Sequence, residues 1–240
     1  YSMVKATRKS LEEIYRTLKP YHRVLTLACG GCTSVCLAGG QREALALNDE
    51  LAELARRDRL AMQFSCFTTE RQCNPEFVGD LKEMVAGCDC MLSTACGVGV
   101  QCLAETYPAT PAFPALDTLF LGADVDVGLY EERCRSCGEC VLAVTGGICP
   151  VVRCSKGSFN GPCGGTRCDG TCEVGGGLHC AWNDIYERLK AQNRVQAILE
   201  YRPPRNWNDK GPATLVQRGY EARYADRLPK TEPGREGKAK

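Results

Sequence analysis

Several features of common protein classes are absent from this sequence of 240 residues. Neither sign of charge predominates, because 30 Lys and Arg residues stand against 29 Asp and Glu residues, whereas a dedicated nucleic-acid binder usually carries a basic excess. No segment approaches the roughly 18 consecutive apolar residues of a membrane span. Residues 1–20 carry charges throughout and lack the apolar stretch of a secretory signal. We therefore expect a soluble, cytoplasmic protein.

The sequence also lacks the motifs of nucleotide-binding enzymes. The glycine pairs at 30–31 and 39–40 match neither the dinucleotide-binding fingerprint nor the Walker pattern. Only two histidines are present, His22 and His179, and we assign neither of them as a ligand. Cysteine, in contrast, is abundant, with 18 residues. A chain of this length can bury a core without disulfides, and cytoplasmic thiols more often bind metal than pair with each other.

The cysteines divide the chain into three zones. Residues 1–128 hold nine, residues 129–182 hold nine together with eleven glycines, and residues 183–240 hold none. We predict an α/β domain with one cysteine metal site over 1–128. A Cys-rich, ferredoxin-like, loop-dominated metal-binding segment follows over 129–182. The last zone, with 13 Lys and Arg against 8 Asp and Glu, is predicted to form a helix and an extended basic tail.

The first zone alternates between strand and helix patterns. Short apolar runs predict strands at 24–27, 60–66 and 90–94, and an edge strand at 113–116 because Pro114 interrupts it. Apolar spacings of three and four predict a helix from Glu43 onward. Asn74 and Pro75 suit the N-cap and first position of a helix over 75–85, and a short helix follows the third strand. This alternation predicts a small Rossmann-like parallel sheet.

The predicted sheet would gather cysteines from distant parts of the chain. In an open α/β sheet the loops that leave the carboxyl ends of parallel strands meet at one edge, where such folds bind ligands. Five cysteines follow the first three strands in this way, and four thiols are enough for one metal centre. These candidates are Cys29, Cys32, Cys36, Cys73 and Cys96.

The second zone opens with Cys134, Cys137 and Cys140 in the C-x2-C-x2-C spacing of bacterial ferredoxins. Cys149-Pro150 resembles the end of such a run, although eight residues separate it from Cys140 where ferredoxins have three. The zone offers eight candidate ligands, enough for two four-cysteine centres. The first three would share one centre with a distant fourth ligand, and the others would supply the second. The remaining candidates are Cys149, Cys154, Cys163, Cys172 and Cys180.

Zinc is the main alternative to iron, because four-cysteine zinc sites also use C-x2-C pairs, and disulfides are a further one. The third thiol of the run would be superfluous to a zinc knuckle, which favours a cluster. Five cysteines lack ligand spacing and read as small buried hydrophobes: Cys66, Cys88, Cys90, Cys102 and Cys168. A thiol-based redox catalyst using Cys66 or Cys102 is the remaining possibility.

Seven motifs in order resemble those of the methylenetetrahydrofolate reductase C-terminal domain family, and in particular its MetV-type, cysteine-rich subunits of the acetogen reductase. The resemblance runs from about Val24 to Trp207. The motifs are Cys29-Gly-Gly-Cys32 through Gly40, Glu70-Arg-Gln-Cys73, Ala95-Cys-Gly-Val-Gly-Val-Gln101, Cys134 through Leu142, Thr145-Gly-Gly-Ile-Cys-Pro150, Asn160-Gly-Pro-Cys-Gly-Gly165 and Cys180-Ala-Trp182.

The resemblance implies a subunit of methylenetetrahydrofolate reductase in the acetyl-CoA (Wood–Ljungdahl) pathway. It implies two or three [4Fe-4S] clusters, with zinc an alternative at one site, held by the thirteen motif cysteines. It also implies a MetF-type TIM-barrel partner that carries the flavin (FMN), and in some acetogens heterodisulfide-reductase-like donors. Three or four strand–helix units are too few for a (β/α)8 barrel. We therefore expect a non-catalytic electron-transfer subunit, with a structural zinc scaffold as the alternative.

Overall fold

The computed structural model describes residues 3–203 and 214–226. The chain divides into a unit of residues 1–199 and a second unit of residues 200–240. Most of the predicted basic tail lies in the second unit, and its residues 204–213 and 227–240 lie outside the described part. What is described there includes one short 3-10 helix, Glu221–Tyr224.

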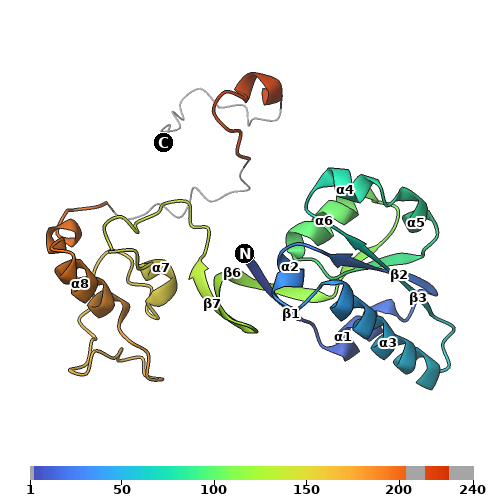
Figure 1. The fold of residues 1–240 in the computed structure, drawn as a ribbon, viewed down its shortest axis with the longest axis horizontal. Helices are drawn as coiled ribbons and strands as arrows, with labels where there is room; N and C mark the ends of the chain where they lie inside the picture. The colour runs from blue at the N-terminus through green and yellow to red at the C-terminus, as the bar shows by residue number, and fades with distance from the viewer. Residues whose placement is uncertain (1–2, 204–213, 227–240) are drawn as a thin grey trace. The chain divides into compact units, whose positions relative to one another are not determined.

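The larger unit contains two sheets and eight α-helices among its described residues (Figure 1). The strands are β1 (Val4–Arg8), β2 (Arg23–Cys29), β3 (Gln63–Thr69), β4 (Cys90–Ser93), β5 (Ala112–Pro114), β6 (Leu116–Asp126) and β7 (Leu129–Cys134). The helices are α1 (Leu11–Leu18), α2 (Cys32–Val35), α3 (Gln41–Arg57), α4 (Pro75–Gly79), α5 (Lys82–Ala86), α6 (Gly97–Thr106), α7 (Pro150–Arg153) and α8 (Ala181–Ala191), with a 3-10 turn at Val195–Ile198.

The predicted parallel sheet is confirmed. Its order is β3-β2-β4-β5, and all three strand pairs are parallel. The central strand β2 is apolar and buried along almost its whole length, as expected for a strand covered on both faces. The edge position predicted for the Pro114 segment is also confirmed, because β5 pairs with β4 alone.

Helices cover both faces of this sheet (Figure 1). On one face α1 and α3 pack against the sheet through a buried cluster that includes Ile14, Leu47 and Leu51. On the other face α4, α5 and α6 contribute Val78, Val85 and Leu103 to a second cluster. The chain therefore leaves β2 toward one face and β4 toward the other. The carboxyl ends of these adjacent strands thus form the crevice in which such folds bind ligands.

The predicted helix over Pro75–Val85 is wrong as a single element. Asn74 caps α4 as expected, since its side chain accepts a hydrogen bond from the Glu76 N–H. However, α4 ends at Gly79, and a new helix, α5, begins at Lys82. Glycine has low helix propensity, and an Asp follows it, so the break has a local cause.

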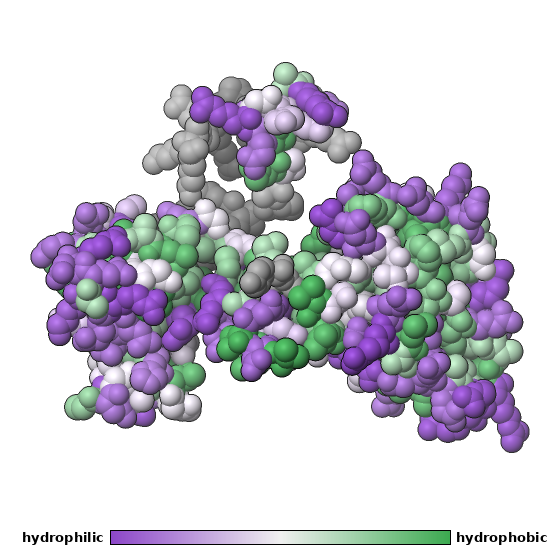
Figure 2. Space-filling model, viewed as in Figure 1, coloured by the Kyte–Doolittle hydropathy of each residue, from purple (hydrophilic) through white to green (hydrophobic). Residues whose placement is uncertain are grey.

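A second, antiparallel sheet of order β1-β6-β7 was not predicted. The hairpin of β6 and β7 spans the expected boundary between residues 128 and 129, with Gly128 in the left-handed region at its turn. Val125, Val127 and Leu129 are exposed near this turn, and Figure 2 shows apolar residues gathered over the hairpin. Lys5 of β1 is buried and forms an ion pair with Asp124 of β6.

The cysteine-rich segment contains little regular structure. After β7 its residues form turns, the four-residue helix α7 and two isolated antiparallel bridges, and the longer helix α8 closes it. A small core, distinct from those of the sheet, holds the segment together, with Ile148, Trp182, Ile185 and Leu189 buried. The prediction of a loop-dominated segment followed by a helix is confirmed. No described helix has both the length and the apolar character needed to cross a membrane.

Candidate metal centres

The loops at the carboxyl edge of the parallel sheet bring four of the predicted thiols together. Cys29 ends β2, Cys32 begins α2, Cys73 follows β3, and Cys96 precedes α6. The pKa of the Cys73 thiol is raised, first by burial and then by the nearby thiols of Cys96, Cys29 and Cys32. The Cys73 residue is exposed.

Cys36, the fifth candidate of this group, points elsewhere. Its Sγ donates to the carbonyl oxygens of Thr33, at 3.6 Å, and of Ala6 on β1, at 3.9 Å. The thiol is buried beside the first strand. Cys73 therefore has three other candidate thiols near it at the sheet edge, whereas Cys36 is held against β1.

A buried polar network positions the loops that carry these thiols. The Gln72 side chain is fully buried; its Nε2 donates to the Leu27 carbonyl at 2.8 Å, and its Oε1 accepts from the Ser93 hydroxyl at 2.6 Å. Ser93 Oγ in turn accepts from the N–H of Ala95. Gln72 immediately precedes Cys73, and its side chain thus joins the loop of Cys73 to the ends of β2 and β4.

Two glycines permit the close approach of these loops. A Cβ on Gly39 would collide with the carbonyl oxygen of Thr94, whose hydroxyl donates to the Gly39 carbonyl at 2.7 Å. A Cβ on Gly99 would lie 2.7 Å from the Ala95 Cβ and 2.9 Å from the Gln72 Cβ. Sequence reasoning did not find the roles of Gln72 and Gly39. The motifs contained both residues, but nothing in their spacing indicates burial.

In the ferredoxin-like run, backbone conformation turns the chain tightly around the thiols. Cys134 ends β7, and its Sγ accepts a hydrogen bond from the Ser136 N–H at 3.3 Å. Ser136 and Gly138 both have positive φ angles, as tight loops around a ligand require. Cys137 is partly buried, whereas Cys134 and Cys140 are exposed.

Cys149 caps α7, with Pro150 at the first helical position. The thiol lies close enough to Arg135 to help raise the pKa of that guanidinium, after the larger effect of Glu132. Arg133, Arg153 and Arg188 line the same cavity of about 310 Å³ as Cys149. Three guanidinium groups therefore share the cavity with this thiol, together with the carboxylate of Glu132.

The last four candidates are connected through a few small residues. The Ser158 N–H donates to Cys154 Sγ at 3.3 Å, while its hydroxyl helps lower the pKa of Cys163. The main cause of that lowered pKa is hydrogen bonding from the Gly165 backbone. The Thr166 hydroxyl donates to Cys180 Sγ at 3.0 Å.

The backbone of Thr166 also forms an antiparallel bridge with that of Cys172. Cys154 packs against the small core that contains Cys180. Cys172 and Cys180 are both buried. Thus Cys154, Cys163, Cys172 and Cys180 lie within one short, densely hydrogen-bonded stretch.

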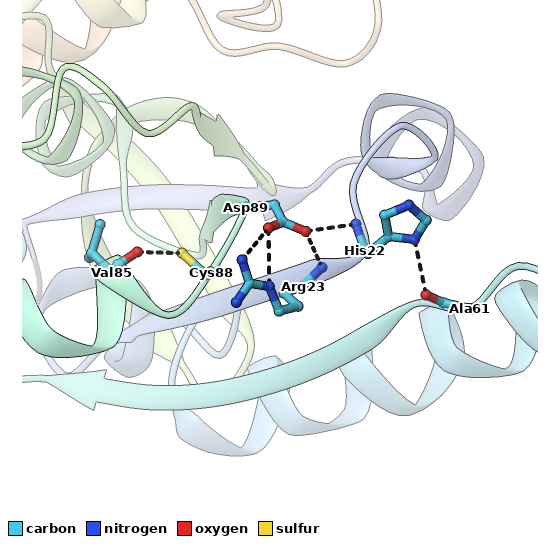
Figure 3. A network of polar contacts seen from close by, with 6 residues as sticks. All are labelled: His22, Arg23, Ala61, Val85, Cys88 and Asp89. Carbon is cyan, nitrogen blue, oxygen red and sulfur yellow. Dashed lines mark hydrogen bonds and ion pairs between the residues drawn. The ribbon is translucent and has the colours of Figure 1, made fainter.

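The five cysteines set aside have other surroundings. Asp89, between Cys88 and Cys90, accepts from the Arg23 guanidinium at 2.8 and 3.1 Å and from the N–H groups of His22 and Arg23 (Figure 3). The Cys88 thiol donates to the Val85 carbonyl. Burial, with smaller effects of Cys88 and Asp89, raises the pKa of Cys90 to about 12.

The other three members of this group differ in burial. Burial raises the pKa of Cys66. Cys102 packs against a sheet core, and Cys168 is exposed. All 18 cysteines fall in the described part of the chain, and none forms a disulfide there.

The donor chemistry fits a thiophilic metal. Each set offers thiol sulfur, the ligand that zinc and iron–sulfur clusters share. Within residues 3–203 and 214–226, no three His, Cys, Asp or Glu side chains are already arranged to hold a metal ion. The residue types therefore suit such a metal, although their side chains would have to move closer together to bind one.

Comparison with known families bears on the second half of the chain. Residues 113–208, about two fifths of the sequence, match the model of a family described as "Methylene-tetrahydrofolate reductase C terminal". This segment is similar to that family. It begins within β5, includes the antiparallel hairpin and contains all eight candidate ligands of the cysteine-rich segment. No curated protein and no solved structure matches the chain.

Proposed function

We propose that this chain is an iron–sulfur electron-transfer subunit associated with a methylenetetrahydrofolate reductase of the Wood–Ljungdahl pathway. The family match supports the association with the reductase. The observation that carries the electron-transfer role is the grouping of Cys29, Cys32, Cys73 and Cys96 by three separate loops at one sheet edge. The nearness of Cys73 to the other three thiols supports this set, because the four residues are up to 67 positions apart in the sequence.

Three sets of ligands are proposed. Cys29, Cys32, Cys73 and Cys96 would hold the first centre. Cys134, Cys137 and Cys140 would hold the second, with Cys149 as the distant fourth ligand. Cys154, Cys163, Cys172 and Cys180 would hold the third. Cys36 is an alternative ligand for the first centre. A bound [4Fe-4S] cluster supplies one-electron transfer.

The residues of the chain would bind and orient such groups. Gln72 would fix the loop of Cys73, and N–H groups such as that of Ser136 would donate to ligand sulfurs. The arginines near Cys149 would offset the negative charge that thiolate ligands carry. The partner would be a MetF-type barrel that carries FMN, with heterodisulfide-reductase-like subunits as donors. This division assigns folate reduction to the partner and electron relay in the cytoplasm to this chain.

Metal and spectroscopic analysis of anaerobically purified protein tests the proposal. We expect iron and acid-labile sulfide, broad visible absorption and an EPR signal after reduction. Cys73→Ser and Cys137→Ser should each lower the iron content, because each removes a ligand from a different centre. Cys90→Ser is the matched control, since this buried thiol lies outside the three sets. A colourless, EPR-silent protein that contains only zinc would refute electron transfer.

A structural zinc scaffold is the second candidate. The feature that favours it is the segment from Cys154 to Cys180, which has little regular structure and only a small core. Four-cysteine zinc sites often close such loop-rich segments. If zinc alone occupies this set, chelation should unfold the segment while the parallel sheet stays folded. Near-UV and far-UV circular dichroism before and after chelation measure the two effects.

A further inference from the structure

The thiol of Cys180 receives a hydrogen bond from a side chain fourteen positions earlier in the sequence. Thr166 Oγ1 lies 3.0 Å from Cys180 Sγ. Cys180 is buried, at 9% exposure, and its backbone is fixed twice, because its N–H donates to the Gly170 carbonyl and its carbonyl accepts from the Asp184 N–H. The sulfur therefore has little freedom to move away from the hydroxyl.

Thr166 is held in place by the same segment. Its backbone pairs with that of Cys172, another proposed ligand. The neighbouring bridge between Thr171 and His179 and the bond from the Arg167 N–H to the Thr171 carbonyl extend this small pairing. The closed loop thus holds the Thr166 backbone, and the short β-branched side chain has few rotamers, which keeps the hydroxyl beside Cys180.

We propose that Thr166 is a positioning residue that sets the reduction potential of the centre held by Cys154, Cys163, Cys172 and Cys180. This inference rests on the proposed function, since it requires a redox-active cluster there. One-electron reduction increases the negative charge on the ligand sulfurs, and a hydrogen bond to sulfur stabilises the more negative state. No proton moves and no bond breaks. The hydroxyl therefore raises the midpoint potential.

The chain offers a matched set of variants. Thr166→Val keeps the shape of the side chain but removes the hydroxyl, and Thr166→Ser restores it. Thr171→Val is the control, because the Thr171 hydroxyl lies in the same loop and bonds to Asp169, at 2.6 Å. Each variant is made in the full-length chain and purified anaerobically with its partner where one co-purifies. EPR-monitored redox titration then gives the midpoint potential of each centre.

We expect Thr166→Val to lower one midpoint potential and to leave the others unchanged. At a fixed potential, the ratio of reduced to oxidised cluster should fall roughly threefold to tenfold, and tenfold corresponds to about 59 mV for a one-electron couple. Thr166→Ser should return the midpoint to the wild-type value. Thr171→Val should not shift it.

Several outcomes would overturn this role. They are an unchanged set of midpoints in Thr166→Val, an equal shift in Thr171→Val, a failure of Thr166→Ser to restore the potential, or loss of iron from Thr166→Val. The last would make Thr166 structural. If the wild-type protein itself contains no redox-active iron, the proposed function fails, and the iron analysis of the wild type reveals this before any variant is compared.

Discussion

Replacing Gln72 with Leu tests whether the buried network, and not only the cysteines, builds the first centre. The substitution keeps the approximate volume and removes both amide hydrogen bonds. The Leu27 carbonyl loses little, because it still accepts from the backbone N–H of Thr94 at 3.0 Å. The Ser93 hydroxyl, fully buried, loses its acceptor.

The expected cost follows from these losses. A buried donor left without a partner costs about 1–3 kcal/mol, and the second bond adds about 1 kcal/mol. We therefore expect Gln72→Leu to lower the free energy of unfolding by about 2–4 kcal/mol. The double variant Gln72→Leu with Ser93→Ala removes the orphaned hydroxyl, so it should be less destabilised than the sum of the two single variants.

Urea denaturation monitored by circular dichroism measures this change, and metal analysis measures its effect on the site. Gln72→Leu should lower the urea midpoint with an unchanged m-value and should reduce the metal bound at the first centre. Gln101→Leu serves as a control, because Gln101 is exposed on α6 and its amide bonds only to the Gly97 carbonyl of its own helix. An unchanged urea midpoint in Gln72→Leu would refute the reasoning.

Three further predictions concern other parts of the molecule. Gly39→Ala should destabilise the protein by roughly 3 kcal/mol in urea unfolding, because the new Cβ meets the Thr94 carbonyl. Gly79→Ala is the control: Gly79 faces open space on α4, so this variant should be neutral or slightly stabilising. Equal changes in the free energy of unfolding would contradict the packing argument. The Arg23 guanidinium, aided by the backbone N–H groups of Arg23 and His22, holds the pKa of Asp89 below its usual 3.8. The ionised Asp89 therefore stabilises the fold fully above pH 3.8, and this stabilisation is lost as the pH falls through the lower pKa of the folded state. Asp89→Asn should therefore be less stable than wild type near neutral pH, with the difference shrinking in acid; a constant difference in thermal unfolding from pH 7 to 2 would refute this. In metal-free protein, iodoacetamide should label Cys163, whose pKa is lowered, before Cys90, whose pKa is raised to about 12. Mass spectrometry gives the order of labelling, and the reverse order would refute the surroundings described for these two thiols.

The parallel sheet could be predicted because its strands are apolar runs between clear turn and helix patterns. Strand β2 and helix α3 carry strong local signals. The second sheet lacked such a signal, since β6 and β7 are mostly exposed and β7 carries three consecutive charged residues. The first helix was missed although Ser10 caps it and Ile14 and Leu18 share its buried face. Its many charges obscured this pattern.

The candidate centres were predictable to a similar degree. Chain topology was sufficient to place Cys29, Cys73 and Cys96 at one edge, because strand order decides where those loops end. Topology did not show that Cys36 faces β1, since this contact depends on how the short helix α2 packs against the first strand. The hydrogen bond between Thr166 and Cys180 was also beyond prediction, because it depends on irregular turns that have no sequence period.

The spacing of the cysteines within the fold has a consequence for how the protein would mature. The thiols of the first set come from loops that meet only after β2, β3 and β4 have paired, so the sheet must form before a metal can be captured there. The set from Cys154 to Cys180 lies within 27 consecutive residues, and closing such short loops costs little chain entropy. A metal could therefore organise that segment early and act as its folding nucleus. One polypeptide would then use two orders of assembly, in which the fold creates one site and the site creates part of the fold.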